Sequence, residues 1–173
     1  MVCLSGEEIE ELPKLALADG LSVDPLRAVD NVAIESVEAQ LLALPQVELP
    51  LNHQFAPGVY LREIFMPAGT FVIGHEHTTE HFNIVTAGRA LVMIAGEPFE
   101  ITAPATFVSK AGVRKVLYIL EDMRWMTVHP SHETDIEKLE GELIVKSPSF
   151  TLYHEDMKKL QFVANLPQFS AHE

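Results

Sequence analysis

The chain has 173 residues, 47% of them hydrophobic, and a formal net charge of −13. This length suits one domain with a sizeable core. The negative charge argues against nucleic acid or an anionic membrane as the main partner, because those surfaces attract clustered Lys and Arg. Cys3 is the single cysteine, so no intrachain disulfide can form. We see no 18-residue apolar run and no signal peptide, and we expect a cytoplasmic protein.

The first part of the chain predicts helices. Ser5 with Glu8 is typical of a capping box at a helix start. From Asp30 to Leu44 apolar residues recur at helical spacing, and Pro45 ends the run. We therefore expect residues 1–46 to form a helical extension that packs on the rest of the domain.

Between residues 47 and 130 the pattern changes to short strands separated by turns. Apolar and polar side chains alternate, and Gly, Pro or acidic residues interrupt the alternation. The expected strands are Val59–Phe65, Thr70–His77, His81–Thr86, Ala90–Ile94, Phe99–Thr102, Thr106–Ser109, Lys115–Leu120 and Arg124–His129. This spacing is typical of a β-sandwich or a small antiparallel barrel.

Residues 131–173 predict a C-terminal extension of the same single domain. Thr134 with Glu137 is a second capping-box pattern, which predicts a short helix through about residue 139. Residues 142–146 could add an edge strand, and residues 154–160 a helical turn.

The segment from Gly69 to Gly88 carries three closely spaced histidines, His75, His77 and His81. Side chains at positions i and i+2 of a strand project to the same face, so we expect His75 and His77 to point the same way. His81 follows after a break long enough for a bend. Imidazoles that converge on one face of a sheet form a divalent-metal site. Half-buried structural histidines are the plainer alternative.

The spacing of this segment resembles the first motif of the cupin superfamily, the RmlC-like jelly rolls, which includes small cupin-like proteins of unassigned function from bacteria and phages. Both glycines of the segment and its His-x-His pair fall on the motif positions. His81 stands where the family has a glutamate, and Glu80 would face the opposite side of the strand. The resemblance implies a small antiparallel jelly-roll barrel with the histidines at its mouth. Members commonly dimerise, and the outward-facing Phe82 and Ile84 would suit a partner surface or the N-terminal helix.

The second cupin motif is degenerate in this chain. Aligned on Gly112, it has Lys115 where the family has its fourth ligand, a histidine. A protonated lysine repels a cation, but it can bind an anionic substrate, or act as a base when burial lowers its pKa. Lys115 is therefore a candidate catalytic and ligand-binding residue, with a solvated surface lysine as the alternative.

Four other residues bear on the site. Asn83 shares the inward face of its strand with His81, where it could bind a ligand or a metal-bound water, or simply pack. His129 ends the last predicted strand and could replace the missing ligand, although a solvent-exposed strand end is the simpler interpretation. Of Arg62 and Glu63 only one can face the interior, and the sequence does not determine which.

These features lead to two functional hypotheses. In the first, His75, His77 and His81, with His129 as an additional ligand, hold one divalent ion (Fe, Mn, Ni or Zn), and Lys115 assists an oxygenase, lyase or isomerase reaction on a small molecule. In the second, the chain is a non-catalytic cupin that binds a small ligand or a protein partner, with a structural metal or none. The degenerate second motif favours the second hypothesis, and both are compatible with a homodimer.

Overall fold

The computed structural model of the chain describes residues 1–5, 31–94 and 97–164. The elements in chain order are β1 (Val2–Leu4), α2 (Asn31–Leu41), β2 (Leu51–Ala56), β3 (Val59–Met66), β4 (Phe71–Ile73), β5 (Glu76–His77), β6 (His81–Ile94), β7 (Glu97–Thr102), β8 (Ala105–Ser109), β9 (Val116–Pro130), α3 (Ile136–Leu143), β10 (Ile144–Val145) and α4 (Pro148–Ala164). The helix expected to start near Ser5 and Glu8 lies outside the described residues. Within those residues, no helix has the length and apolar character needed to cross a membrane.

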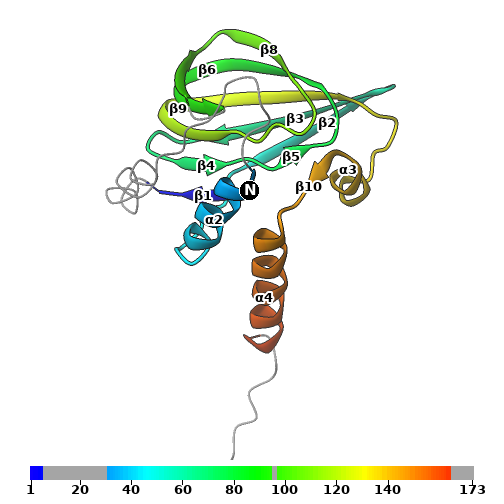
Figure 1. The fold of residues 1–173 in the computed structure, drawn as a ribbon. Coiled ribbons are helices and arrows are strands. Elements are labelled where there is room, and N and C mark those ends of the chain that lie inside the picture. Colours follow the sequence, from blue (N-terminus) through cyan, green and yellow to red (C-terminus); the bar gives the residue numbers. More distant parts are fainter. Residues whose placement is uncertain (6–30, 95–96, 165–173) are drawn as a thin grey trace, which may run out of the picture.

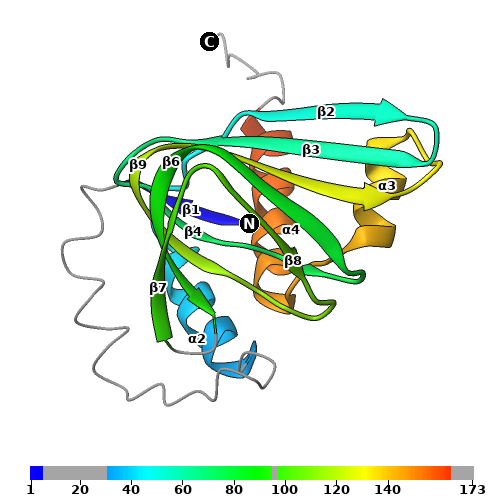
Figure 2. The ribbon, with the colours of Figure 1, turned by 90° about the horizontal axis from the view of Figure 1, so that it is seen from above.

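The strands form a curled antiparallel sheet that wraps around an interior, as Figures 1 and 2 show. The long strands β6 and β9 pair with each other along most of their length. β9 also pairs with β3 and β4, which in turn pair with β2 and β1, while β6 pairs with β7 and β8. A short second sheet joins β5 to β10. The expected mainly β, antiparallel barrel is confirmed.

β6 and β9 run through both halves of the curled sheet because they bend midway. Their register shifts between Val85 and Ala90 of β6, and such irregularities sharpen the twist of a strand. Gly88 lies at this bend with φ 86°. A Cβ there would collide with the backbone of Asp122 and Met123, so both the conformation and the close approach require glycine.

Hydrocarbon fills much of the interior. Buried side chains from several strands form one cluster, and β6 and β9 contribute residues to it along their length. Its members are Cys3, Met66, Val72, Val85, Ala90, Val92, Ile101, Leu117, Ile119, Met123 and Trp125. Alternate residues of each strand point inward, as the period of two requires.

The N-terminal region adds both a strand and a helix to the outside of the barrel. The expected helical extension of residues 1–46 did not include β1, which pairs with β4. α2 covers the outer side of these strands, packing Ile34 and Leu41 against Leu4 and Ile73. α4 contacts the same cluster through Phe150 and then extends away from the barrel (Figure 1).

The C-terminal region follows the expected order of elements with shifted bounds. Asp135, rather than Thr134, caps α3, accepting hydrogen bonds from the backbone N–H groups of Glu137 and Lys138. β10 is a strand as expected, but it pairs with β5 beside His77 rather than with the main sheet. The helical turn expected at residues 154–160 is part of the longer α4.

Candidate metal centre

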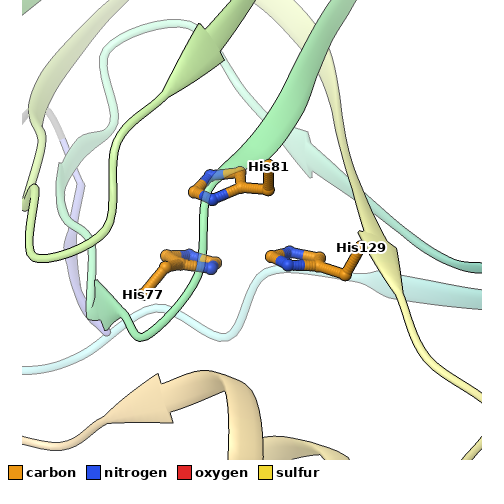
Figure 3. A group of neighbouring side chains, drawn as sticks. All are labelled: His77, His81 and His129. Carbon is orange, nitrogen blue, oxygen red and sulfur yellow. The ribbon is translucent and has the colours of Figure 1, made fainter.

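Three histidines meet inside the barrel, and they come from different strands. Figure 3 shows His77 from β5, His81 from the start of β6 and His129 from the end of β9, with their rings facing one another. Their ring centroids lie 4.2 Å (His77–His81), 5.1 Å (His77–His129) and 4.7 Å (His81–His129) apart. One ligand atom from each ring falls within 4.8 Å of the others. Nitrogens that share a metal ion at about 2.0–2.1 Å fall inside this separation.

Each of the three rings has a buried nitrogen without a hydrogen-bond partner in the described structure. These are Nδ1 of His77, Nε2 of His81 and Nδ1 of His129. Buried polar atoms normally have a hydrogen-bond partner, so three buried nitrogens without one in a single cluster indicate a site for a bound group. A metal ion would satisfy all three at once.

The tautomer of His81 suits metal binding. Its Nδ1 lies 3.1 Å from the carbonyl oxygen of Thr79. A carbonyl can only accept a hydrogen bond, so Nδ1 carries the hydrogen and Nε2 keeps its lone pair. A hydrogen bond at the second ring nitrogen is how proteins orient a histidine ligand.

The surroundings keep the cluster neutral. Burial lowers the pKa of His129 to about 4, and the positive charges that His81, Arg62 and Lys115 can carry lower it further. The pKa of His77 falls far below its usual range, again mainly through burial, and burial also lowers the pKa of His81. Neutral imidazoles have the lone pairs that a metal needs.

α3 and β10 close this end of the barrel. Leu139 and Leu143 of α3 pack on Tyr60, whose ring stacks on His129 at a centroid distance of 6.1 Å. Ile144 of β10 pairs with His77. These contacts shield the histidines from solvent, and His129 is only 2% exposed. The interpretation of His129 as a solvent-exposed strand end is therefore wrong.

The structure does not bring His75 into this cluster. β4 ends at Ile73, and Gly74 and His75 lie between strands, so the alternation expected across residues 70–77 is interrupted. The ring of His75 instead contacts the amino group of Met1 and packs in a T-shaped arrangement with the ring of Phe150, at a centroid distance of 4.6 Å. His75 and His77 do line the same cavity, but with different neighbours.

A cavity of about 90 Å³ lies beside the cluster, and Lys115 lines it together with His77. By the same measure one water molecule needs about 10–15 Å³, so there is space for a small molecule. Lys115 is 8% exposed, so the alternative of a solvated surface lysine is wrong. Burial lowers the pKa of Lys115 to about 8, which leaves it mostly protonated at neutral pH.

Asn83 lines the cavity as well, but its amide is engaged. Its Nδ2 donates to Ser109 Oγ at 2.8 Å, and its Oδ1 accepts from Trp125 Nε1 at 3.0 Å. These bonds fix the buried amide between three strands. Its expected role toward a ligand stays a prediction.

The structure shows the outcome of one prediction about strand faces and of one choice that the sequence left open. Glu80 lies on the surface, where it pairs with Lys110 at 2.6 Å, while His81 points inward as expected. On β3, Arg62 faces the cavity, and Glu63 faces outward, where it pairs with Arg124 at 3.1 Å. Both faces of β3 carry apolar residues, so the sequence pattern held no signal for this orientation.

Comparisons with known proteins return cupins of low similarity. No known family model matches the sequence, and no curated protein matches it. Among solved structures, the chain is similar to a cupin-2 domain-containing protein from Shewanella frigidimarina, at 13% identity and TM-score 0.40 over 55% of this chain and 92% of that one. It is also similar to an RmlC-like cupin family protein with a double-stranded β-helix fold from Methanocaldococcus jannaschii, at 13% identity and TM-score 0.42 over 54% of this chain and 86% of that one. A predicted oxalate decarboxylase from Thermotoga maritima matches at 12% identity and TM-score 0.41 over 48% of this chain and 80% of that one. Likenesses at this level say nothing about ligand or activity.

Proposed function

We propose that this protein is a metal-binding cupin in which His77, His81 and His129 hold one divalent ion next to a small-molecule cavity. The observation that carries this proposal is the set of three buried, unpartnered imidazole nitrogens in one cluster. An all-imidazole donor set suits first-row metals such as Zn, Fe, Mn and Ni. The ligand set differs from the sequence hypothesis in that His129 replaces His75.

The bound ion would act as a Lewis acid toward an oxygen-donor ligand in the cavity. The chain supplies the remaining chemistry. Lys115 lines the cavity with His77, so its ammonium group can hold a negative charge on a substrate or donate a proton from Nζ. Its lowered pKa brings that proton transfer closer to neutral pH. Oxygenase, lyase and isomerase reactions on a small molecule are all compatible with this arrangement.

The second candidate is a non-catalytic cupin that binds a small ligand with the same metal. One observation favours it: among the described residues that line the cavity there is no carboxylic acid to work with Lys115. A screen for turnover of small acids, thiols and diketones by the metal-loaded protein separates the two candidates. Consumption of oxygen or of substrate that stops in Lys115→Met supports the enzyme.

We also propose a homodimer formed by the outward face of β6 and β8. Phe82 and Val108 are cross-strand neighbours on this face, and they are 58% and 48% exposed. Within the described residues α2 packs elsewhere, against β1 and β4, and does not cover them. Phe82→Asp should convert a dimer to a monomer in sedimentation analysis, and a monomeric wild type would exclude the dimer.

The experiment for the metal site is elemental analysis of protein purified without an affinity metal. The wild type should contain close to one equivalent of a divalent metal. His77→Ala, His81→Ala and His129→Ala should each lose most of it, because three ligands become two.

His75→Ala is the matched control, since it removes a histidine two residues from His77 that lies outside the cluster. It should keep the metal. A wild type without metal would exclude the metal site, and loss of metal in His75→Ala with retention in His129→Ala would restore the ligand set predicted from the sequence.

A further inference from the structure

The cavity beside the histidines is positively charged, although the protein as a whole is acidic. Arg62 and Lys115 both line it, and among its described lining residues there is no Asp or Glu. Lys115 is buried and Arg62 half-buried. Within the described part of the chain neither has a hydrogen-bond or ion-pair partner, whereas the buried Arg114 is paired with Glu38. With a net charge of −13, an unneutralised pair of cations is unexpected unless something anionic binds there.

An unsatisfied hydroxyl lies next to Arg62. Thr127 of β9 is the direct cross-strand partner of Arg62 on β3, and side chains in such positions are about 4.5–5.5 Å apart at Cβ. Thr127 also lines the cavity. Its Oγ1 is buried and has no hydrogen-bond partner in the described structure. A guanidinium and a free hydroxyl side by side form a recognition site for a carboxylate.

The inward-facing pairs of β3 and β9 change from polar to apolar along the strands, starting at the histidine cluster. Tyr60 pairs with His129, and Arg62 pairs with Thr127 in the next inward row. The rows that follow are apolar: Ile64 with Trp125, and Met66 with Met123. A ligand held at the Arg62 row would therefore have the metal site on one side and hydrocarbon on the other.

We propose that the cavity binds a small aliphatic carboxylic acid. Arg62 and Thr127 hold its carboxylate beside the metal site, and Lys115 contributes the second positive charge. The hydrocarbon part of the ligand lies against the apolar side chains that line the same cavity: Ile64, Met66, Val72, Leu117 and Trp125. This inference rests on the proposed function in placing the ligand next to a metal ion, but the contacts to Arg62 and Thr127 do not require the metal.

The charges of Arg62 and Lys115 reach the same groups. Both lower the pKa of His77 and of His129, and both line the cavity beside His77. Glu140 is the carboxylate that competes for Arg62, because both line a smaller cavity of about 10 Å³ on the α3 side. Glu140 is already paired with Lys146 at 3.1 Å, which leaves Arg62 available.

The test is calorimetric titration of the full chain with butyrate, butyramide, acetate and inorganic phosphate, with and without a chelator. Butyramide matches butyrate in shape but carries no charge, and acetate lacks most of the hydrocarbon. Butyrate should bind about tenfold or more tightly than butyramide and more tightly than acetate or phosphate, the factor expected for a charge-assisted hydrogen bond. Arg62→Gln should abolish the preference for butyrate over butyramide.

Two variants serve as comparisons. Thr127→Val keeps the shape of the side chain and removes the hydroxyl, so it should weaken butyrate binding several-fold. Arg124→Gln removes an outward-facing arginine of β9, the strand that carries Thr127. Arg124 pairs with Glu63 on the surface, so this variant should bind butyrate like the wild type. Metal content and circular dichroism of each variant confirm that it is folded.

Each result has one meaning for the inference. Equal binding of butyrate and butyramide, wild-type affinity in Arg62→Gln, or tighter binding of phosphate than of butyrate would overturn it. Arg62-dependent butyrate binding by a protein without metal would support the inference and contradict the proposed metal site. Stoichiometric metal without butyrate binding would contradict the inference alone.

Discussion

The two halves of the β6–β9 pair face the same interior with opposite chemistry. In one half, His81 and Asn83 of β6 lie on the inward face with Thr127 and His129 of β9. In the other half, beyond the bend at Gly88, Ala90 and Val92 pair with Ile119 and Leu117. The second half is closed by hydrocarbon and stabilises the fold. The first half leaves buried nitrogens unpaired. Under the proposed function it would depend on a bound ligand, and binding and stability would then be divided between the halves.

The largest effect on stability is expected at a buried ion pair between α2 and Arg114, which hydrogen-bonds to the backbone next to His75. Glu38 of α2 and Arg114 form a buried pair at 2.7 Å, and Arg114 Nε donates to the carbonyl of Gly74 at 3.0 Å. Glu38→Ala leaves a buried guanidinium uncompensated and should lower the free energy of unfolding by about 3–5 kcal/mol.

Urea denaturation measures this effect, and the exposed pair of Glu80 and Lys110 provides the control. Glu80→Ala should be indistinguishable from the wild type. The double variant Glu38→Leu/Arg114→Met should be more stable than Glu38→Ala, because no charge is left unpaired. Equal stability of Glu38→Ala and Glu80→Ala would show that the buried pair does not hold the backbone next to His75.

The next effect contrasts the two halves directly. Ile119 is fully buried in the apolar half, and Ile119→Ala should cost about 2–5 kcal/mol of unfolding free energy through lost contacts and a cavity. His129→Leu in the histidine half should be neutral or stabilising in chelator-treated protein, since it removes a buried nitrogen without a partner. Denaturant unfolding of both variants tests the contrast, which fails if His129→Leu is as costly as Ile119→Ala.

Local patterns in the sequence predicted the strands well and their continuity poorly. Alternation identified both segments of β6 and both segments of β9, but Ala87-Gly88-Arg89 and Glu121-Asp122 have the composition of turns. In the structure these residues form a bend within continuous strands. A bend and a turn use the same residues, and only pairing between distant strands distinguishes them. β1 and β2 were not predicted for similar reasons. β1 depends on its pairing with β4, which lies far along the chain. β2 forms a hairpin with β3 and leaves its apolar residues exposed.

The histidine site shows the same limit. His77 and His81 were predicted to face inward, and they do. The period-two rule also predicted His75 beside His77, but it applies only while the strand continues, and β4 ends at Ile73. His129 reaches the cluster because β9 pairs with both β3 and β6. That closure of the barrel has no local signature, so spacing alone could not rank His129 above His75.

A smaller effect is the loss of folding stability caused by burying the charge of Lys115 in the cavity. Burial lowers the pKa of Lys115 to about 8, against an ordinary value of about 10.5 in the unfolded chain. Between these pH values the unfolded state holds more protons, so stability falls as the pH falls from about 10.5 to 8 and stays reduced below. Lys115→Met should therefore be more stable than the wild type by about 3 kcal/mol at pH 7, and the difference should vanish above about pH 10.5.

Urea unfolding of the wild type and Lys115→Met at pH 7 and pH 10.5 measures this difference. Lys110, exposed on the surface, provides the matched control, and Lys110→Met should show no such dependence on pH. A Lys115→Met variant less stable than the wild type at pH 7 would mean that the charge has a partner that stabilises it in the folded protein.

The smallest effect is the stabilisation expected when a metal ion binds the histidine cluster of chelator-treated protein. An ion that binds only the folded protein stabilises it by about 2.7 kcal/mol at a free concentration of 100 times its Kd, which for a chain of this size is roughly 5–10 °C in Tm. Added to chelator-treated protein, Zn²⁺ or Mn²⁺ should raise the Tm of the wild type, of His75→Ala and of Ile119→Val by similar amounts. It should leave His77→Ala and His129→Ala nearly unchanged, because their clusters keep only two imidazoles. An equal rise in all five proteins would place the ion elsewhere, and the unpaired nitrogens of the histidine half would then need another partner.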